Sequence, residues 1–190
     1  MGGGDKCLQP LGGKPLLAHV VSRLAPQVSC LVINANGDPS RFDGFGLPIV
    51  ADNVSDFQGP LAGIEAGLSW VAAQYPDAAW AVTVPGDTPF IPSDLVARLV
   101  QAAQGASMAV AGSGEGVHPV VGLWPLSMAE ALRKALAADQ RKVSRWVEMQ
   151  GAAQVLFPPV ELGETRIDPF FNINRPDDLG VAEALLDRET

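Results

Sequence analysis

The sequence has little of what several protein classes require. It contains 2 Cys and 2 His in 190 residues, which is too few for a disulfide scaffold or a histidine-rich metal site. Basic residues are also scarce, with 13 Lys+Arg against 21 Asp+Glu and a formal net charge of -8. That balance argues against a general nucleic-acid binder, which needs a basic face. No apolar run approaches the ~18 residues of a membrane span, so we expect no membrane partner and a reducing, cytoplasmic location.

Several motifs that define common enzyme classes are missing as well. The sequence has no G-x-x-x-x-G-K-[ST] phosphate loop, no G-x-G-x-x-G dinucleotide fingerprint and no H-E-x-x-H zinc motif. It also lacks the G-x-S-x-G elbow of the α/β-hydrolases. The net charge does not exclude a phosphorylated small molecule as ligand, because a local basic pocket does not depend on net charge.

The composition indicates an ordinary folded domain. Hydrophobic residues make up 47% of the chain and charged residues 18%, which excludes a disordered or coiled-coil protein. At this length a chain buries roughly 70% of its unfolded surface, so a core forms without disulfide or metal support. We therefore predict a single domain over residues 1–190.

Short apolar runs alternate with helical patterns, which predicts an α/β fold. Residues 15–25 show the pattern best, because their apolar positions recur at helical spacing and Pro15 suits the first helical position. Helices are expected over 15–25, 60–74, 93–104, 126–136, 142–150 and 176–186. Strands are expected over 28–34, 47–51, 80–84, 107–111, 117–123 and 153–157.

Three of the predicted strands end in polar clusters, at residues 34–36, 51–53 and 85–89. Ligands of such sheets bind beyond the carboxyl ends of the strands, so these clusters are expected to converge on a site. Asp87 is the strongest candidate because it follows a very apolar strand. A carboxylate there suits Mg²⁺, which takes one or two protein carboxylates and completes its shell with water and phosphate. The alternative is an aspartate that caps a turn.

The N-terminal segment is rich in glycine and ends in Asp5 and Lys6. Backbone N–H groups of such a loop can cradle phosphates, and a lysine can neutralise them. A disordered chain terminus is the alternative. Of the two histidines, His19 lies on the apolar face of the first predicted helix and is expected to pack there. His118 starts a predicted strand, where a structural or substrate-edge role is expected.

Five segments together resemble the molybdenum cofactor guanylyltransferase (MobA) family. Asp5-Lys6 followed by Gly13-Lys14-Pro15-Leu16-Leu17 resembles its G-x-D-K and G-K-P-L signature. Gly59-Pro60-Leu61-Ala62-Gly63 resembles its G-P-L-A-G helix start, and Pro85-Gly86-Asp87-Thr88-Pro89 its metal-binding turn. Residues 171–179 resemble its closing N-x-N-T-P-E-[ED]-L motif. The cytidylyltransferase relatives carry Asp-x-Asp in that last place and lack G-P-L-A-G, so the resemblance favours the guanylyl branch.

The resemblance implies a three-layer α/β/α fold with a Rossmann-like, mostly parallel sheet of the nucleotidyltransferase type. It implies an enzyme that transfers GMP from GTP to molybdopterin, with Mg²⁺ as cofactor and pyrophosphate as the leaving group. GTP and molybdopterin would be the substrates, and a molybdoenzyme or a cofactor-delivery protein the protein partners. Two alternatives stay open: a cytidylyl- or sugar-phosphate nucleotidyltransferase of the same fold, and a non-catalytic nucleotide- or cofactor-binding protein.

The family's motifs also imply roles for individual residues. Gly3, Gly4 and Lys6 match the phosphate-binding loop, with Lys6 and Asp87 as the catalytic pair and Asp87 as the metal ligand. Asn34 and Asp52 match positions near the guanine nucleotide, where a carboxylate can accept from guanine N1–H and N2–H₂. Four residues are expected on the molybdopterin side: Asn172, Asn174, Arg141 and Lys142. A solvated helix start is the alternative for the two basic ones.

Two departures from the family pattern stand out. The family's first strand and its L-A-G-G-x-x-x-R-M loop have no counterpart in the sequence, which opens at residues resembling the end of that loop. Either the true start lies upstream of the first residue, or the chain is truncated. If the chain were complete as written, the loss of a central strand would expose apolar faces and unpaired backbone groups, and we would expect weak GTP binding and poor solubility. Arg175 stands where the family usually has Thr, at a helix entry that loses an N-cap.

Overall fold

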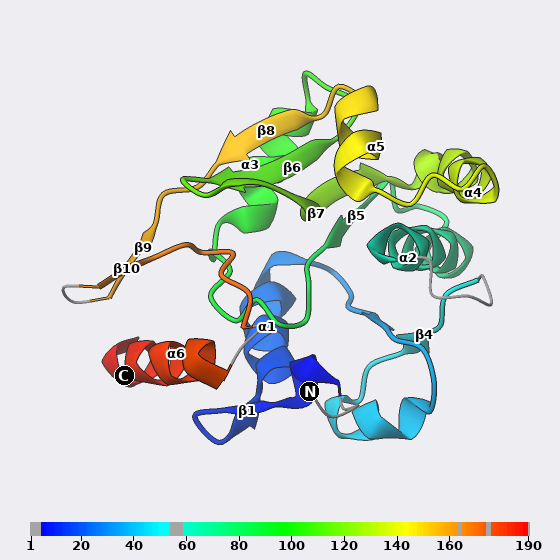
Figure 1. Cartoon of the computed structure of the whole chain (residues 1–190). Helices are drawn as coiled ribbons and strands as arrows, with labels where there is room; N and C mark the ends of the chain where they lie inside the picture. The colour runs from blue at the N-terminus through cyan, green and yellow to red at the C-terminus, as the bar shows by residue number, and fades with distance from the viewer. Residues whose placement is uncertain (1–4, 54–58, 163–164, 174–175, 190) are drawn as a thin grey trace.

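The computed structural model describes residues 5–53, 59–162, 165–173 and 176–189. A four-stranded sheet in the order β5-β7-β6-β8, called the central sheet below, lies in the upper half of the view in Figure 1. Its strands are β5 (Trp80–Thr83), β6 (Ala109–Ser113), β7 (Gly116–Pro125) and β8 (Ala153–Leu156). Both β5 and β6 pair antiparallel with β7, and β6 pairs parallel with β8. Three of the four strands therefore run in one direction, and only β7 opposes them.

Three smaller pairs of strands complete the β structure. A separate parallel pair consists of β3 (Ile33–Asn34) and β4 (Ile49–Val50). Two antiparallel hairpins, which the sequence pattern did not predict, flank the C-terminal helix. Their strands are β1 (Pro10–Leu11), β2 (Lys14–Pro15), β9 (Val160–Leu162) and β10 (Thr165–Ile167).

The helices lie close to where the sequence pattern predicts them. They are α1 (Leu16–Leu24), α2 (Pro60–Gln74), α3 (Leu95–Ala103), α4 (Ala129–Ala137), α5 (Val143–Met149) and α6 (Pro176–Glu189). Short 3₁₀ turns are η1 (Lys6–Leu8), η2 (Ala25–Gln27), η3 (Pro39–Phe45) and η4 (Leu126–Met128). In α1, the buried residues Leu16, Leu17, Val20 and Leu24 confirm the apolar face.

The sheet separates two layers of helices, which confirms the three-layer α/β/α class. On one face, Val110 and Trp124 pack in a cluster with α2, α4 and α5. On the other face, Ala109, Ala111 and Leu123 pack with α1 and α3. Neighbouring strand residues thus point to opposite faces, as the two-residue period of a β-strand requires.

The predicted strand over 28–34 is shorter in the structure. Only Ile33 and Asn34 are assigned to β3, which pairs with β4 alone among the described strands. A β-strand forms only where its backbone pairs with a neighbouring strand. The partner of this segment, β4, is two residues long, so β3 is equally short. The sequence predicted the apolar character of this segment but not the limited pairing.

Both histidines have structural contacts. His19 Nε2 donates to the carbonyl oxygen of Leu11 at 2.8 Å, which ties α1 to the β1–β2 hairpin. His118 is hydrogen-bonded to Ser113 Oγ at 2.8 Å and lies 3.6 Å from an oxygen of Asp168. Its ring also packs against Phe170, with the two centroids 4.8 Å apart. His118 thus fixes the segment after β10 to the central sheet.

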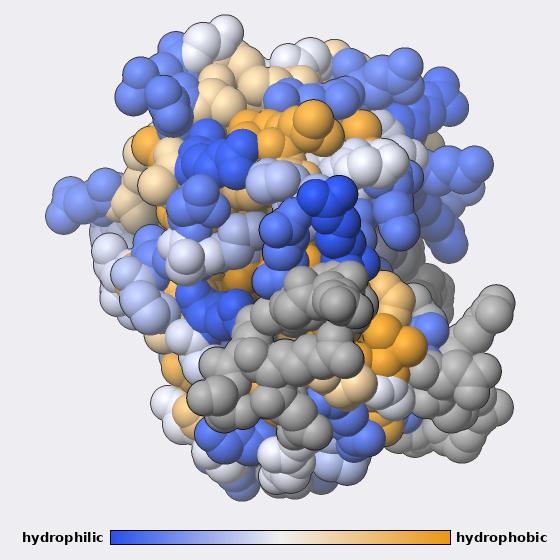
Figure 2. All heavy atoms as spheres, turned by 90° about the vertical axis from the view of Figure 1, so that its left-hand side faces the viewer, coloured by the Kyte–Doolittle hydropathy of each residue, from blue (hydrophilic) through white to orange (hydrophobic). Residues whose placement is uncertain are grey.

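Among the described residues visible in Figure 2, no extended apolar face is present. Hydrophilic residues cover much of that side, and apolar residues lie between them in separate patches. Isolated exposed apolar side chains such as Met149 and Leu156 are normal for a folded domain. Within the described part of the chain, no helix is long and apolar enough to cross a membrane.

We expect Leu132→Ala to destabilise the fold, because Leu132 is fully buried in the cluster that joins α2 to α4. The lost burial and the cavity left behind cost about 2–5 kcal/mol of unfolding free energy. Leu156→Ala is the matched control, since Leu156 is 67% exposed and its truncation changes stability by no more than about 0.5 kcal/mol. Urea denaturation measures both. Equal effects of the two substitutions would contradict the packing described here.

Candidate functional site

A cavity of about 940 Å³ lies between the central sheet and the β3–β4 pair. Its lining includes residues of α1, α2, β3 and β5, and much of it is apolar. Among the described strands, β3 and β5 belong to different sheets and each pairs with a single neighbour. Polar residues enter the lining where the strands end.

The first two polar clusters meet at the cavity as expected. Asn34 Nδ2 donates to Asp52 Oδ1 at 3.0 Å, and Asn36 Nδ2 donates to Asp52 Oδ2 at 2.8 Å. The backbone N–H of Asp52 in turn donates to Asn36 Oδ1 at 2.8 Å. Each carboxylate oxygen of Asp52 keeps a lone pair for a further donor. The cluster therefore presents a fixed, partly satisfied carboxylate to the cavity.

Helix α2 passes directly beneath this cluster, and its sequence permits the approach. A Cβ added at Gly63 would overlap Asn34 Oδ1 and would lie 3.5 Å from Asp52 Oδ1. The helix begins after Gly59, whose φ of 77° lies in the left-handed region that favours glycine. The G-P-L-A-G segment thus has a physical explanation: one glycine makes the turn into the helix and the other leaves room for Asn34.

The N-terminal segment is joined to the same cluster through Arg41. Its guanidinium forms an ion pair with Asp5 and donates to the backbone oxygens of Asn36 at 2.5 Å and Asp38 at 2.7 Å. The sequence prediction left out both Arg41 and Asn36. Asn36 could have been found, because it belongs to the polar strand end 34–36, whereas Arg41 lies in no motif and is placed only by the fold.

The third polar strand end connects the N- and C-terminal parts of the chain. Thr88 Oγ1 donates to Asn172 Oδ1 at 2.6 Å, and the N–H of Ile173 donates to the backbone oxygen of Asp87 at 3.2 Å. Gly86 faces the 3₁₀ turn η1, since a Cβ added at Gly86 would lie 3.1 Å from the Cβ of Cys7. The Asp87 turn is therefore fixed by the N- and C-terminal parts of the described chain. Pro85 and Gly86 of this turn line the cavity, whereas Asp87 and Lys6 do not.

The charge of Asp87 is only partly compensated. Burial raises the pKa of the Asp87 carboxyl, while its own backbone N–H and the nearby ammonium of Lys6 lower it. Burial, Asp5 and Asp87 together raise the pKa of the Cys7 thiol to about 11. Cys7 therefore stays protonated near neutral pH and is no nucleophile. Lys6 and Asp87, the catalytic pair expected from sequence, lie close enough to interact electrostatically.

The other expected site residues are distributed as follows. Asn172 lines the cavity together with Asn34 and Asp52. Gly3, Gly4 and Asn174 lie outside the described residues, as does Arg175. Arg141 and Lys142 are exposed just before α5. The Arg141 side chain pairs with Asp139 at 2.7 Å, and its backbone oxygen lies 3.9 Å from a Cβ added at Gly59. Arg141 thus borders the start of α2.

The residues around Asp87 suit a cation that is shared with a ligand. Within the described ranges, no group of three or more His, Cys, Asp or Glu side chains could hold a metal by itself. Mg²⁺ does not need such a group, because one or two carboxylates with water and phosphate oxygens complete its shell. A half-buried carboxylate with incomplete compensation, such as Asp87, fits this mode of binding.

Comparisons with known proteins find close relatives. Residues 1–155 match the model of the MobA-like NTP transferase domain. A molybdenum cofactor guanylyltransferase of Rhodopseudomonas palustris (strain BisB5) is 51% identical over 193 residues, covering 100% of this chain and 90% of the relative.

The crystal structure of molybdopterin-guanine dinucleotide biosynthesis protein A from Archaeoglobus fulgidus is 23% identical with a TM-score of 0.69, covering 98% and 92% of the two chains. A 2-C-methyl-D-erythritol 4-phosphate cytidylyltransferase from Thermus thermophilus is 20% identical with a TM-score of 0.65, covering 96% and 94%. The two structures show the fold.

We expect Gly63→Ala to disrupt the polar cluster, because the added methyl group displaces Asn34 from Asp52. Such overpacking costs about 1–3 kcal/mol of stability, and the stabilisation of the protein by GTP should fall with it. Gly180→Ala in α6 is the control, since a Cβ there meets nothing within 4 Å and Gly180 does not line the cavity. It should raise stability by about 0.4–1 kcal/mol. Thermal unfolding with and without GTP and Mg²⁺ tests both, and equal behaviour would contradict the close approach.

We expect Asp87→Asn to stabilise the protein in a pH-dependent way. The raised pKa of Asp87 means that the folded state holds its proton more tightly than the unfolded state. The wild-type protein therefore loses this stabilisation as the pH rises through the folded pKa, whereas the asparagine variant does not. The variant's advantage in melting temperature should grow from about pH 4 to pH 7. A constant or shrinking difference over that range would show that burial does not disfavour the charged form.

Proposed function

The chain belongs to the MobA-like NTP transferase family, and from this premise we propose how its cleft performs guanylyl transfer. It is a molybdenum cofactor guanylyltransferase, which joins GMP from GTP to molybdopterin and releases pyrophosphate. The whole-chain identity of 51% to a curated enzyme of that name supports this activity. The single structural observation that carries the proposal is the meeting of the first two polar strand ends at one cavity, whose lining also includes Pro85, Gly86 and Asn172 beside the Asp87 turn.

The guanine base is assigned to the first two strand ends. Asp52 has a lone pair left on each carboxylate oxygen after accepting from Asn34 and Asn36. Two such acceptors match guanine N1–H and N2–H₂, whereas adenine offers no donor pair of this kind. A missing hydrogen bond at a buried polar group costs much more than a missing apolar contact, so this pairing can discriminate between nucleobases.

The triphosphate is assigned to the N-terminal segment and the Asp87 turn. Lys6 supplies a positive charge beside Asp87, and Gly3 and Gly4 would add backbone N–H donors. A Mg²⁺ ion held by Asp87 would supply charge stabilisation at the phosphoryl oxygens. The net charge of -8 makes such a local positive site necessary for a polyanionic substrate.

The chemistry needs no general base from the protein. The terminal phosphate of molybdopterin is already an anion near neutral pH, and its oxygen attacks the α-phosphorus of GTP in line. The bond from the α-phosphorus to the bridging oxygen breaks, and pyrophosphate leaves with that electron pair. Lys6 stabilises the charge that develops on the phosphoryl oxygens and on the leaving group. Both histidines have structural partners, His19 at the Leu11 carbonyl and His118 at Ser113 and Asp168, and this chemistry asks for no proton transfer from either.

The acceptor side of the cleft is assigned to the C-terminal segment. Asn172 is held against the Asp87 turn by Thr88, so a ligand that contacts Asn172 lies next to the reacting phosphates. Asn174 is assigned to the same side by the family motif. Arg141 and Lys142 would attract the pterin phosphate from the rim near α2. A cytoplasmic location and a molybdoenzyme or delivery protein as acceptor of the product complete the proposal.

The activity test is Asp87→Asn. We expect guanylyl transfer to fall by about 100-fold or more, because stabilisation of the developing charge is lost, while the variant stays folded. Asp94→Asn is the control, since the Asp94 side chain is 58% exposed and pairs only loosely, at 3.8 Å, with Arg98 four residues along α3. Pyrophosphate release from GTP and molybdopterin with Mg²⁺ measures the rate. Wild-type turnover by Asp87→Asn would overturn the assignment of Asp87.

A nucleotide panel separates this activity from its alternatives. Only the true substrate should raise the melting temperature strongly in the presence of Mg²⁺. A larger shift with CTP than with GTP would favour a cytidylyltransferase. A GTP shift without any pyrophosphate release would favour a non-catalytic binding protein.

A further inference from the structure

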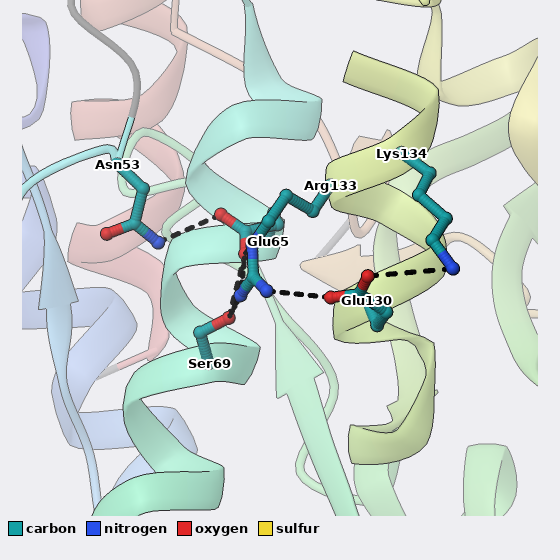
Figure 3. Close-up of polar contacts among 6 residues, drawn as sticks. All are labelled: Asn53, Glu65, Ser69, Glu130, Arg133 and Lys134. Atoms are coloured by element: carbon teal, nitrogen blue, oxygen red, sulfur yellow. Dashed lines mark hydrogen bonds and ion pairs between the residues drawn. The ribbon is translucent and has the colours of Figure 1, made fainter. Parts of the chain in front are cut away.

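A buried carboxylate lies on the far side of the nucleotide cluster. Glu65 of α2 is only 2% exposed, although glutamate is rarely buried unless it is paired. Its Oε1 accepts from Ser69 Oγ at 2.8 Å and from Arg133 at 2.9 and 3.2 Å. Its Oε2 accepts from Asn53 Nδ2 at 2.9 Å. Figure 3 shows these groups converging on Glu65 from α2, from α4 and from the segment after β4.

The contact with Asn53 connects Glu65 to the proposed nucleotide site. Asn53 directly follows Asp52 in the chain, and Asp52 is held from the other side by Asn34 and Asn36. The dipeptide is therefore fixed at both of its side chains, one to the β3 end and one to helix α2. A carboxylate acceptor is stronger than a neutral one, which makes Glu65 an effective anchor for an exposed amide.

Arg133 provides the charge that allows Glu65 to be buried. Its guanidinium spans Glu65 and Glu130, with an N–O distance of 2.8 Å to the latter. Removing the partner of a buried charge is strongly destabilising, so Glu65 depends on Arg133. The ion pair with Glu130 is different, because the Glu130 side chain is 59% exposed and exposed pairs contribute little.

We propose that Glu65 is a positioning residue for the nucleotide site: through Asn53 it fixes the position of Asp52 and so sets the affinity for the guanine nucleotide. This proposal rests on the proposed function, because it takes Asp52 as a contact of the base. Glu65 itself does not line the cavity, so it acts only through Asn53. Helix α4, which supplies Arg133, thereby becomes part of the support of the site.

The test compares Glu65→Gln, Asn53→Ala and the double variant. The loss of a charge-assisted hydrogen bond corresponds to about a tenfold increase in KM for GTP, with kcat within about twofold of wild type. Because both residues act through one contact, the double variant should show the same KM as either single variant. Glu130→Gln is the matched control, since it removes the exposed partner of Arg133 and leaves Glu65 paired; its KM should equal that of wild type.

Direct GTP binding by calorimetry, without molybdopterin, separates the two proposals. A wild-type protein that binds no GTP would overturn the proposed function itself. A wild-type protein that binds GTP, together with Glu65→Gln of equal affinity or with additive effects in the double variant, would overturn only the positioning role. If Glu65→Gln does not fold, Asn53→Ala decides, because Asn53 is exposed and its truncation leaves the pair of Glu65 and Arg133 in place. An unchanged KM in that variant would overturn the proposal.

Discussion

The close approach of helix α2 to the ends of β3 and β4 is the constraint on which the rest of the site depends. It brings the backbone of Gly63 against the Asn34 side chain, which in turn is bonded to Asp52. The same helix carries Glu65, whose carboxylate holds Asn53 on the opposite side. One helix therefore determines where the strand-end carboxylate lies, by leaving out a side chain at one position and burying a charge two residues later.

The overall negative charge of the protein disfavours binding of anionic substrates, and the fold offsets this by placing cationic side chains near the site. The chain carries a net charge of -8, yet its substrates are polyanions. Lys6 lies beside Asp87, and Arg41 neutralises Asp5 while holding the loop that contains Asn36. The raised pKa of the Asp87 carboxyl shows that this group is held at some cost to stability. Such a cost is typical of functional sites, where groups are arranged for a ligand and not for the fold alone.

The sequence predicted the helices well because each depends on a local pattern. The apolar spacing over residues 15–25 and the G-P-L-A-G start at Gly59 are properties of neighbouring residues, and α1 and α2 begin and end close to the predicted bounds. The strands were predicted less well. The apolar run over 28–34 is only a two-residue strand, because backbone pairing depends on a partner elsewhere in the chain. The hairpin of β1 and β2 was missed although Gly12-Gly13, both at positive φ, is a two-residue turn signal, because its strands are only two residues long and show no alternating pattern. The β9–β10 pair was missed as well.

The sequence by itself determined the family and the α/β class, and it predicted the site residues, since motifs such as Gly59–Gly63 and Pro85–Pro89 consist of consecutive positions. Only the tertiary structure decided which of these residues act together. It placed Arg41 against Asp5 and Asn36, joined Thr88 to Asn172 across 84 positions, and placed Arg133 over Glu65 across 68 positions. The physical reason is that hydrogen bonds and ion pairs act over a few ångströms in space, and sequence separation does not reveal which distant groups the packing of helices on the sheet brings within that range.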